Sequence, residues 1–202
     1  MRQLGFMEKL LGGVEIEWKP LSSIAQVLNG YAFKSSRYSD GGIRIVRISD
    51  VQKGKMSDKN LKFYPVESEE EIQRYLLKEN DLVMSLTGNV GRVAMLSKDD
   101  LPAGLNQRVA CLRAEKNKVL TRYLFHFFDQ LSFESEAMSN ATGAGQKNLS
   151  TNWLGSYLIP IPCPNNPEKS LAIQAEIVRI LDTFTELTTE LTTELNARKK
   201  QY

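Results

Sequence analysis

Four short polar segments of this chain carry side chains suited to hydrogen bonding with the edges of nucleic-acid bases and with phosphates. Asn and Gln can form paired hydrogen bonds with adenine and Arg with guanine, whereas Lys, Arg and Ser commonly contact phosphate oxygens. The segments span residues 31–38, 87–92, 106–108 and 142–148. Each alone is more often an ordinary turn, so the prediction rests on having four of them beside a locally basic stretch. With Arg47 added from that stretch, the predicted DNA contacts are Tyr31, Lys34, Ser35, Ser36, Arg37, Arg47, Asn89, Arg92, Asn106, Gln107, Arg108, Gln146, Lys147 and Asn148.

Charge is distributed unevenly, although the formal net charge of the 202 residues is only +2. Residues 30–62 hold eight cations and three acids, a local excess of +5. Residues 67–81 hold six acids and two cations, a local excess of −4. Such separation predicts a basic face and an acidic face, and a basic face attracts phosphates.

Side chains for catalysis are sparse. His126 is the single histidine, which removes most triads and His-based metal sites. The chain has no GxxxxGK[ST] loop, and residues 143–148 lack the third glycine of a GxGxxG motif. Glu17 and Lys19 have an acid-x-lysine spacing found in nucleases, but no partner acid precedes them. We therefore predict no catalytic residue, no metal site and no cofactor of its own, with a metal-dependent nuclease built from distant carboxylates as one alternative.

The four segments must be positioned by strands and helices. The sequence patterns predict that these form an α+β domain over residues 1–163, with a mixed or antiparallel sheet and flanking helices. Apolar alternation and short apolar runs indicate extended segments at 14–18, 43–48, 81–86, 92–96, 105–113 and 157–162. Capping residues and helical spacing indicate helices at 4–11, 22–28, 68–77 and 121–138. Gly88 and Gly91 favour a tight turn that joins two of the strands as a hairpin.

A long helix is predicted over residues 164–202. Asn166, Pro167 and Glu168 form a helix start, in which Asn caps free N–H groups and Pro suits the first helical position. Heptad spacing then defines an apolar seam that favours a partner helix, and hence a coiled coil and a homodimer. The predicted seam residues are Ile173, Ile177, Ile180, Phe184, Leu187 and Leu191. A coiled-coil scaffold that pairs proteins without binding DNA is the second alternative.

The cellular setting follows from what the sequence lacks. The first residues do not resemble a signal peptide, and no apolar run approaches the roughly 18 residues that a membrane span needs. Cys111 and Cys163 lie in apolar surroundings without a CxxC motif, which is typical of reduced thiols. We predict a cytoplasmic protein with no membrane contact.

An ordered set of short motifs resembles the specificity subunit of type I restriction-modification enzymes. Each motif is weak by itself, but their order and spacing span nearly the whole chain. They are residues 18–21 (WKPL), 30–36 (GYAFKSS), 45–50 (IVRISD), 77–82 (LKENDL), 87–91 (TGNVG), 105–107 (LNQ), 145–150 (GQKNLS), 159–162 (IPIP) and 174–177 (QAEI), followed by the Thr-Glu-Leu repeats of the terminal helix.

This resemblance implies a target recognition domain that reads one half of a bipartite sequence in double-stranded DNA, and a helix that spaces it from a second domain. It also implies that the chain is not an enzyme. Methylation subunits that bind S-adenosylmethionine would dock on it, and through them a restriction subunit. Family members usually have two recognition domains and two spacer helices, whereas this sequence has one of each. The resemblance therefore predicts a half-length subunit or a truncated one, and an antiparallel pair of copies would restore the two-domain arrangement.

Overall fold

The computed structural model of the chain describes residues 12–199. A four-stranded antiparallel sheet in the order β2-β10-β7-β8 forms the centre of the domain. A smaller sheet has the order β6-β3-β9, in which β3 runs antiparallel to β6 and parallel to β9. Two further pairs, β1 with β11 and β4 with β5, are antiparallel. The strands are β1 (Ile16–Pro20), β2 (Ala25–Asn29), β3 (Ile43–Val46), β4 (Val51–Gln52), β5 (Lys55–Met56), β6 (Phe63–Tyr64), β7 (Leu82–Ser85), β8 (Val93–Met95), β9 (Ala103–Leu105), β10 (Val109–Ala114) and β11 (Leu158–Pro162).

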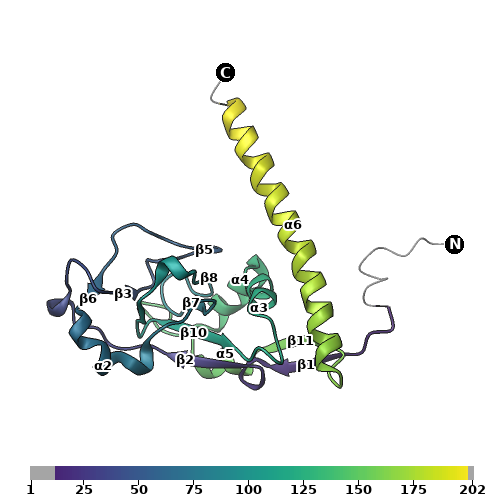
Figure 1. The fold of residues 1–202 in the computed structure, drawn as a ribbon, viewed down its shortest axis with the longest axis horizontal. Coiled ribbons are helices and arrows are strands. Elements are labelled where there is room, and N and C mark those ends of the chain that lie inside the picture. The colour runs from purple at the N-terminus through teal and green to yellow at the C-terminus, as the bar shows by residue number, and fades with distance from the viewer. Residues whose placement is uncertain (1–11, 200–202) are drawn as a thin grey trace.

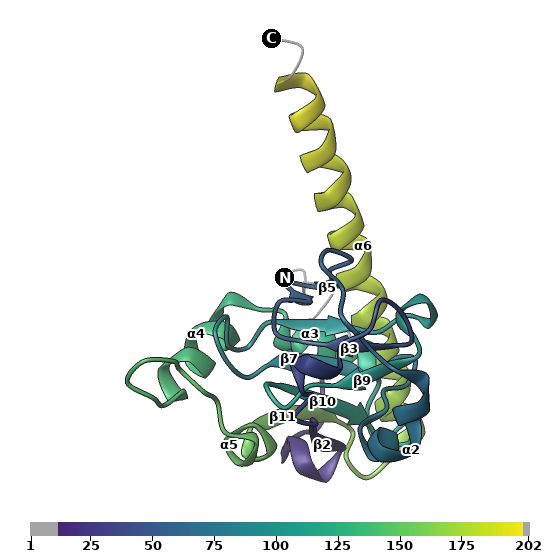
Figure 2. The ribbon, with the colours of Figure 1, turned by 90° about the vertical axis from the view of Figure 1, so that its left-hand side faces the viewer.

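The helices divide between the domain and a projection from it. Figure 1 shows α6 leaving the domain as one straight helix, and Figure 2 shows the same from a perpendicular direction. At about 1.5 Å per residue, its 33 residues extend about 50 Å. The helix bounds are α2 (Glu69–Ile72), α3 (Thr121–Phe128), α4 (Leu131–Asn140), α5 (Thr151–Ser156) and α6 (Pro167–Lys199). The predicted α+β architecture with a long C-terminal helix is thus confirmed, and the short helix predicted at 4–11 lies outside the described residues.

The central sheet is buried on both faces. Along β7, Leu82 and Met84 enter the cluster formed with the helices, whereas Val83 between them enters a cluster formed with the smaller sheet. β10 alternates in the same way, with Leu112 on the helix side and Cys111 on the other. This period of two is the side-chain alternation of a strand, and burial of both faces explains why these strands are short continuous apolar runs.

One predicted helix is a strand. The segment predicted to be helical over 22–28 forms β2, whose register with β10 runs from Ala25 opposite Ala114 to Asn29 opposite Ala110. Only Leu21–Ser23 at its start makes a 3-10 turn. Pairing with a buried neighbouring strand outweighs local helical preference here, because strand formation depends on the sheet context.

The helix predicted over 68–77 is reduced to the single turn of α2 with 3-10 turns on either side. The prediction assumed that Ser68 and Glu71 cap the helix together, but Ser68 makes no capping hydrogen bond. Instead Arg37 Nη2 donates to Ser68 Oγ at 2.9 Å, and Arg37 Nη1 donates to Glu71 Oε2 at 2.9 Å. A residue 31 positions earlier therefore occupies both side chains that the capping box needed.

The helix predicted over 121–138 is broken between α3 and α4. Phe128 and Phe133 are both buried and pack edge to face, with ring centroids 4.6 Å apart. On one continuous helix these positions would be about 140° apart around the axis and could not both face the same core. The break at Asp129 and Gln130 allows both rings to enter it.

The first part of α6 belongs to the domain core. Asn166 Oδ1 accepts a hydrogen bond from Lys169 N at 3.0 Å, which confirms the predicted cap. Ile173 is buried, and Ile177 packs against the main cluster. Gln174 is fully buried; its amide accepts from Leu120 N at 3.0 Å and donates to Lys118 O at 3.2 Å.

No helix among residues 12–199 is both long enough and apolar enough to cross a membrane.

An ionic contact marks where α6 leaves the domain. Asp182 Oδ1 accepts from Arg122 Nε at 2.8 Å and lies 2.7 Å from His126 Nε2. Burial alone would raise the pKa of Asp182, but the hydrogen bonds from Arg122 and His126 outweigh it and hold this pKa below its ordinary value.

We expect Asp182→Asn to lower the free energy of unfolding by about 1 kcal/mol at pH 7, because the pair is partly exposed to solvent. Since the pKa is lower in the folded state, the stabilisation is present above the unfolded pKa near 4 and is lost as pH falls through the folded value. Urea unfolding at pH 7 and at stepwise lower pH should show the variant and wild type converging in acid. Glu186→Gln, one turn further along the exposed helix, is the control; a loss in Asp182→Asn that did not shrink in acid would contradict the assignment.

Candidate nucleic-acid interface

The four polar segments predicted to read DNA lie side by side. Tyr31 N donates to Leu105 O at 2.7 Å and Gln107 N donates to Tyr31 O at 3.0 Å, which joins segment 31–38 to segment 106–108. Leu86 N donates to Arg108 O at 2.9 Å, which places segment 87–92 on the other side of segment 106–108.

The fourth segment continues the same row. Leu149 N donates to Leu86 O at 2.8 Å, and a β-bridge pairs Thr87 with Asn148. Within the segment, Thr142 and Asn148 exchange two backbone hydrogen bonds, so residues 142–148 form a closed loop. The backbone thus connects all four predicted segments in the spatial order 31–38, 106–108, 87–92 and 142–148. Figure 2 shows the last of them projecting beside α4 and the 3-10 turn of the first near the centre of the view.

Close approach of two backbones explains a glycine at the start of this row. A Cβ on Gly30 would lie 2.2 Å from Asn106 O, a distance that no side chain tolerates. Gly88 has φ +72° and Gly91 has φ +85°, the left-handed region that glycine occupies without strain. Glycine is therefore required both where segments 31–38 and 106–108 meet and where segment 87–92 turns.

Most predicted DNA contacts are exposed along this row. Asn106 is half-buried, and its Oδ1 accepts from Arg108 N at 3.1 Å, which fixes the turn that presents its two neighbours. The exposed members are Lys34, Ser35, Ser36, Arg37, Asn89, Gln107, Arg108, Gln146, Lys147 and Asn148. These side chains offer amide, guanidinium, hydroxyl and ammonium groups on adjacent loops, the mixture that base edges and phosphates require.

Arg47 is held by its own loop. Its Nε and Nη2 donate to the fully buried Asp50 at 3.2 and 3.0 Å, and Nη2 also donates to Asn60 O at 2.7 Å. Arg92 is half-buried and reaches Gln52 Oε1 at 3.5 Å. The structure thus gives Arg47 a role in shaping residues 47–60 that the sequence prediction did not include, while its predicted DNA contact stays a prediction.

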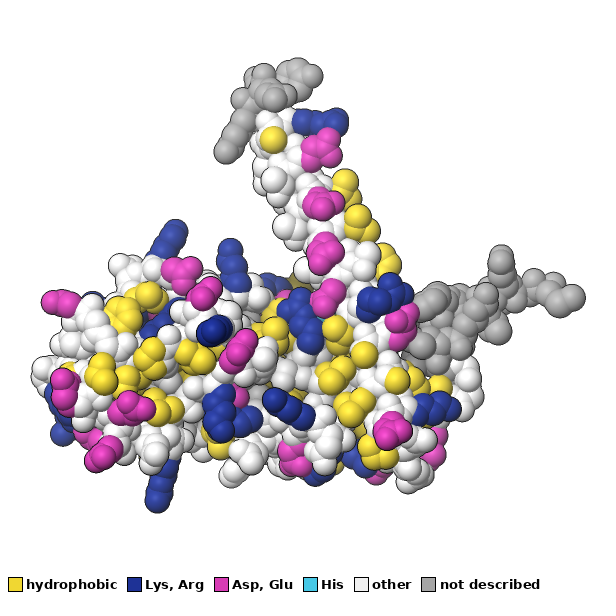
Figure 3. All heavy atoms as spheres, viewed as in Figure 1, with side chains coloured by type: hydrophobic (Ala, Val, Ile, Leu, Met, Phe, Trp, Pro, Cys, Tyr) yellow, Lys and Arg dark blue, Asp and Glu magenta, His cyan; other side chains and the backbone are white. Residues whose placement is uncertain are grey.

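Ion pairs change the predicted separation of charge. Four of the eight cations in residues 30–62 are paired: Arg37 with Glu71, Arg44 with Asp100, Arg47 with Asp50 and Lys53 with Glu134. Glu71 belongs to the acidic segment, so the basic and acidic segments neutralise each other in part. Within residues 12–199, Lys34, Lys55, Lys59 and Lys62 form no ion pair. On the face that Figure 3 shows, Lys and Arg side chains are dispersed over the domain with Asp and Glu side chains among them.

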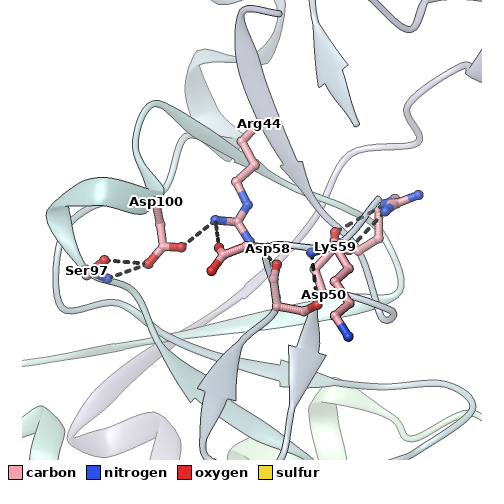
Figure 4. A network of polar contacts seen from close by, with 8 residues as sticks. Arg44, Asp50, Asp58, Lys59, Ser97 and Asp100 are labelled. Atoms are coloured by element: carbon pink, nitrogen blue, oxygen red, sulfur yellow. Dashed lines mark hydrogen bonds and ion pairs between the residues drawn. The ribbon is translucent and has the colours of Figure 1, made fainter. Parts of the chain in front are cut away.

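A buried ion pair supports the loop after β3. Arg44 points into the domain and pairs with Asp100; both are buried. Arg44 Nη2 also donates to Ser57 O at 2.7 Å, and Asp100 Oδ2 accepts from Ser97 N and Ser97 Oγ, both at 2.8 Å. Figure 4 shows these contacts, with Asp58 also beside the Arg44 guanidinium. Arg44 therefore connects the loop that contains Ser57 to Asp100 in the body of the domain.

The predicted dimer seam of α6 is divided into two parts. Ile173 is buried in its own domain and Ile177 and Ile180 are half-buried, so this part of the seam is largely occupied. Phe184, Leu187 and Leu191 are exposed, with 63%, 49% and 66% of their surfaces accessible. Leu195 is also exposed, and Figure 3 shows hydrophobic side chains along one side of the projecting helix. The free apolar stripe therefore begins near Phe184, and the prediction of Ile173 as a pairing residue is corrected.

Solved structures share the fold of this chain. The chain superposes on a chain from a structure of type I R-M system assembly with a TM-score of 0.67 and 18% identity, covering 87% of this chain and 40% of the other. An HsdS subunit from Thermoanaerobacter tengcongensis gives a TM-score of 0.63 at 16% identity, covering 91% of this chain and 43% of the other. At these identities the likeness is one of fold.

Sequence comparison establishes the family. Residues 14–200 match the family model described as type I restriction modification DNA specificity domain, and the chain belongs to this family. It is 36% identical over its full length to the specificity subunit of the Escherichia coli type I restriction enzyme EcoprrI and 35% identical to that of EcoR124I/EcoR124II. It spans 51% and 46% of these two relatives, about half of their length. The resemblance predicted from the motifs is thereby confirmed.

Proposed function

We propose that this chain reads one half of a bipartite DNA target as a non-catalytic specificity subunit. The observation that carries this proposal is the row of four segments joined by backbone hydrogen bonds, because it presents ten exposed polar side chains on adjacent loops. Family membership supports the same function. Neither alternative, a scaffold indifferent to DNA or a metal-dependent nuclease, gains support from the comparisons, and no group of three potential metal ligands occurs among residues 12–199.

Selection from a library of random double-stranded DNA tests this proposal. We expect the purified chain to enrich one short sequence and its affinity to fall steeply with salt, since each phosphate contact contributes a slope of about −0.9 in log K against log salt. If no sequence is enriched and binding does not depend on salt, the result would favour the coiled-coil scaffold that does not bind DNA. Cleavage of plasmid DNA that requires a divalent ion would favour the nuclease.

The partners follow from the same proposal. Methylation subunits would dock on this chain, recruit the restriction subunit and bring S-adenosylmethionine, so the chain alone needs no cofactor. A purified chain that transferred methyl groups to DNA would overturn this part. The cytoplasmic location stays a prediction.

We further propose that two copies pair through the exposed stripe of α6, which gives a symmetric reader of two half-sites. Leu187→Asp combined with Leu191→Asp is expected to weaken self-association by at least 100-fold, because each burial of a leucine contributes about 1.5–3 kcal/mol and the new charges would face each other. Light scattering across a concentration series measures the change.

The matched control adds the same two charges to another side of the helix. Thr189 and Thr193 are exposed, and their hydroxyls donate to Thr185 O and Thr189 O within the helix. Thr189→Asp with Thr193→Asp should leave the mass in solution unchanged. A wild-type chain that stayed monomeric at high concentration would contradict the pairing.

A further inference from the structure

Glu71 lies outside segment 31–38, here called the recognition segment, and contacts residues near both of its ends. Tyr31 Oη donates to Glu71 Oε1, and Arg37 Nη1 donates to Oε2 at 2.9 Å and to Oε1 at 3.3 Å. One carboxylate thus holds a residue at the start of the segment and a residue at its end, 40 and 34 positions away in the sequence.

The backbone that carries Glu71 is anchored in the core. Its neighbour Ile72 is fully buried in a cluster that also contains Phe33, Ile45 and Tyr64. The rings of Phe33 and Tyr64 pack edge to face with centroids 4.9 Å apart, and the Arg37 guanidinium lies 4.8 Å from the centroid of Tyr64. The buried Ile72 therefore gives the backbone of Glu71 a defined position relative to segment 31–38.

Three of the residues between the two held ends are exposed on a tight turn. Arg37 N donates to Lys34 O at 3.0 Å and Tyr38 N donates to Ser35 O at 3.2 Å, which closes the 3-10 turn Ser35–Arg37. Lys34, Ser35 and Ser36 are exposed on this turn. Fixing both ends of so short a segment fixes the direction in which these three side chains point.

Arg37 already has a carboxylate partner, although its side chain is 41% exposed. Charge-assisted hydrogen bonds between a guanidinium and a carboxylate are among the stronger polar contacts in proteins. A phosphate that took Nη1 of Arg37 would have to displace Glu71 from it. The two ends of the segment, which the sequence predicted to touch DNA, act together with Glu71 in shaping it.

We propose that Glu71 is a positioning residue, whose carboxylate clamps Tyr31 and Arg37 and thereby sets where Lys34, Ser35 and Ser36 meet DNA. This inference rests on the proposed DNA-reading function. It also predicts an unusual combination of effects, because removal of the carboxylate both loosens the segment and releases a cation toward the DNA.

Glu71→Gln in the full chain tests this proposal, with Glu70→Gln as the matched control. Both variants lose one negative charge, but only Glu71 contacts the recognition segment. Binding is measured to the duplex enriched from the library and to an unrelated duplex. We expect Glu71→Gln to bind the unrelated duplex more tightly, with a salt slope steeper by about 0.9 because Arg37 is released. Its preference for the enriched duplex should fall about tenfold, the scale of one misplaced base contact.

A spectroscopic measurement reports on the clamp without DNA. The hydrogen bond to Glu71 is the largest contribution to a raised pKa of Tyr31. Phenolate absorbance during alkaline titration, with Tyr31→Phe used to assign the signal, should show Tyr31 ionising at lower pH in Glu71→Gln and unchanged in Glu70→Gln.

The outcomes are distinguishable. A wild-type chain with a preferred duplex, whose preference is reduced in Glu71→Gln but kept in Glu70→Gln, supports the proposal. A preference that is the same in both variants overturns it and leaves the proposed function intact. A wild-type chain with no preferred duplex overturns the proposed function and this inference with it.

Discussion

Replacing Gln107 and Arg108 together by alanine is expected to abolish discrimination between the preferred duplex and an unrelated one, with a loss of preference of about 100-fold or more. Both side chains are exposed at the centre of the row of four segments, on a turn fixed by Asn106. Each paired contact to a base contributes about 1–3 kcal/mol of discrimination, so two such contacts give this magnitude. Competition binding between the two duplexes at fixed salt measures it.

The matched control lies at the opposite end of β10. Lys116 and Asn117 are also an exposed cation and an exposed amide, and they follow the strand that Gln107 and Arg108 precede. Alanine at both should leave the preference unchanged. If the Gln107 and Arg108 variant instead weakened binding to both duplexes equally, these residues would contact phosphates and the reading role would belong to the other segments.

Asp100→Ala is expected to lower the free energy of unfolding by about 3–5 kcal/mol, because it leaves the Arg44 guanidinium buried without its carboxylate. Arg44 Nε already has no hydrogen-bond partner, so little remains to compensate the charge. Urea unfolding monitored by circular dichroism measures the loss.

Two further variants separate the causes. Asp58 lies 3.9 Å from the same guanidinium but is 88% exposed, so Asp58→Ala should cost no more than about 1 kcal/mol. Asp100→Asn keeps an oxygen that can accept from Ser97 and removes only the charge. We expect it to lower the free energy of unfolding by less than Asp100→Ala does, so that its stability can be measured even if the alanine variant does not fold. Equal stability of Asp100→Ala and Asp58→Ala would contradict the importance of the buried pair.

Elements specified by nearby residues were predictable from the sequence. The cap at Asn166 and the proline after it located the start of α6, and the two glycines after Leu86 located the β7–β8 hairpin. Elements decided by distant partners were not. β2 is a strand because β10 lies beside it, and α2 is short because Arg37 takes the side chains expected to cap it. No local pattern records either partner.

The candidate site divides in the same way. The chemical types of Gln107, Arg108 and Asn148 identified them as candidates, but their adjacency depends on backbone hydrogen bonds between segments far apart in the chain. The sequence also gave no means of telling a free cation from a paired one. Arg37 and Arg47 both appeared available for phosphates, whereas each has a carboxylate partner that the charge counts could not assign.

The buried amide of Gln174 has a consequence for the geometry of any assembly. A helix held only by apolar contacts can roll about its long axis, because such contacts have little directional preference. The Gln174 side chain instead accepts a hydrogen bond from Leu120 N and donates one to Lys118 O. Both hydrogen bonds form at only one rotation of α6 about its long axis. Since no proline or glycine interrupts the helix after that point, the same rotation is transmitted to Phe184 and Leu191. The direction in which the exposed apolar stripe faces, relative to the four polar segments, is thus set by contacts inside the domain and does not depend on a second helix.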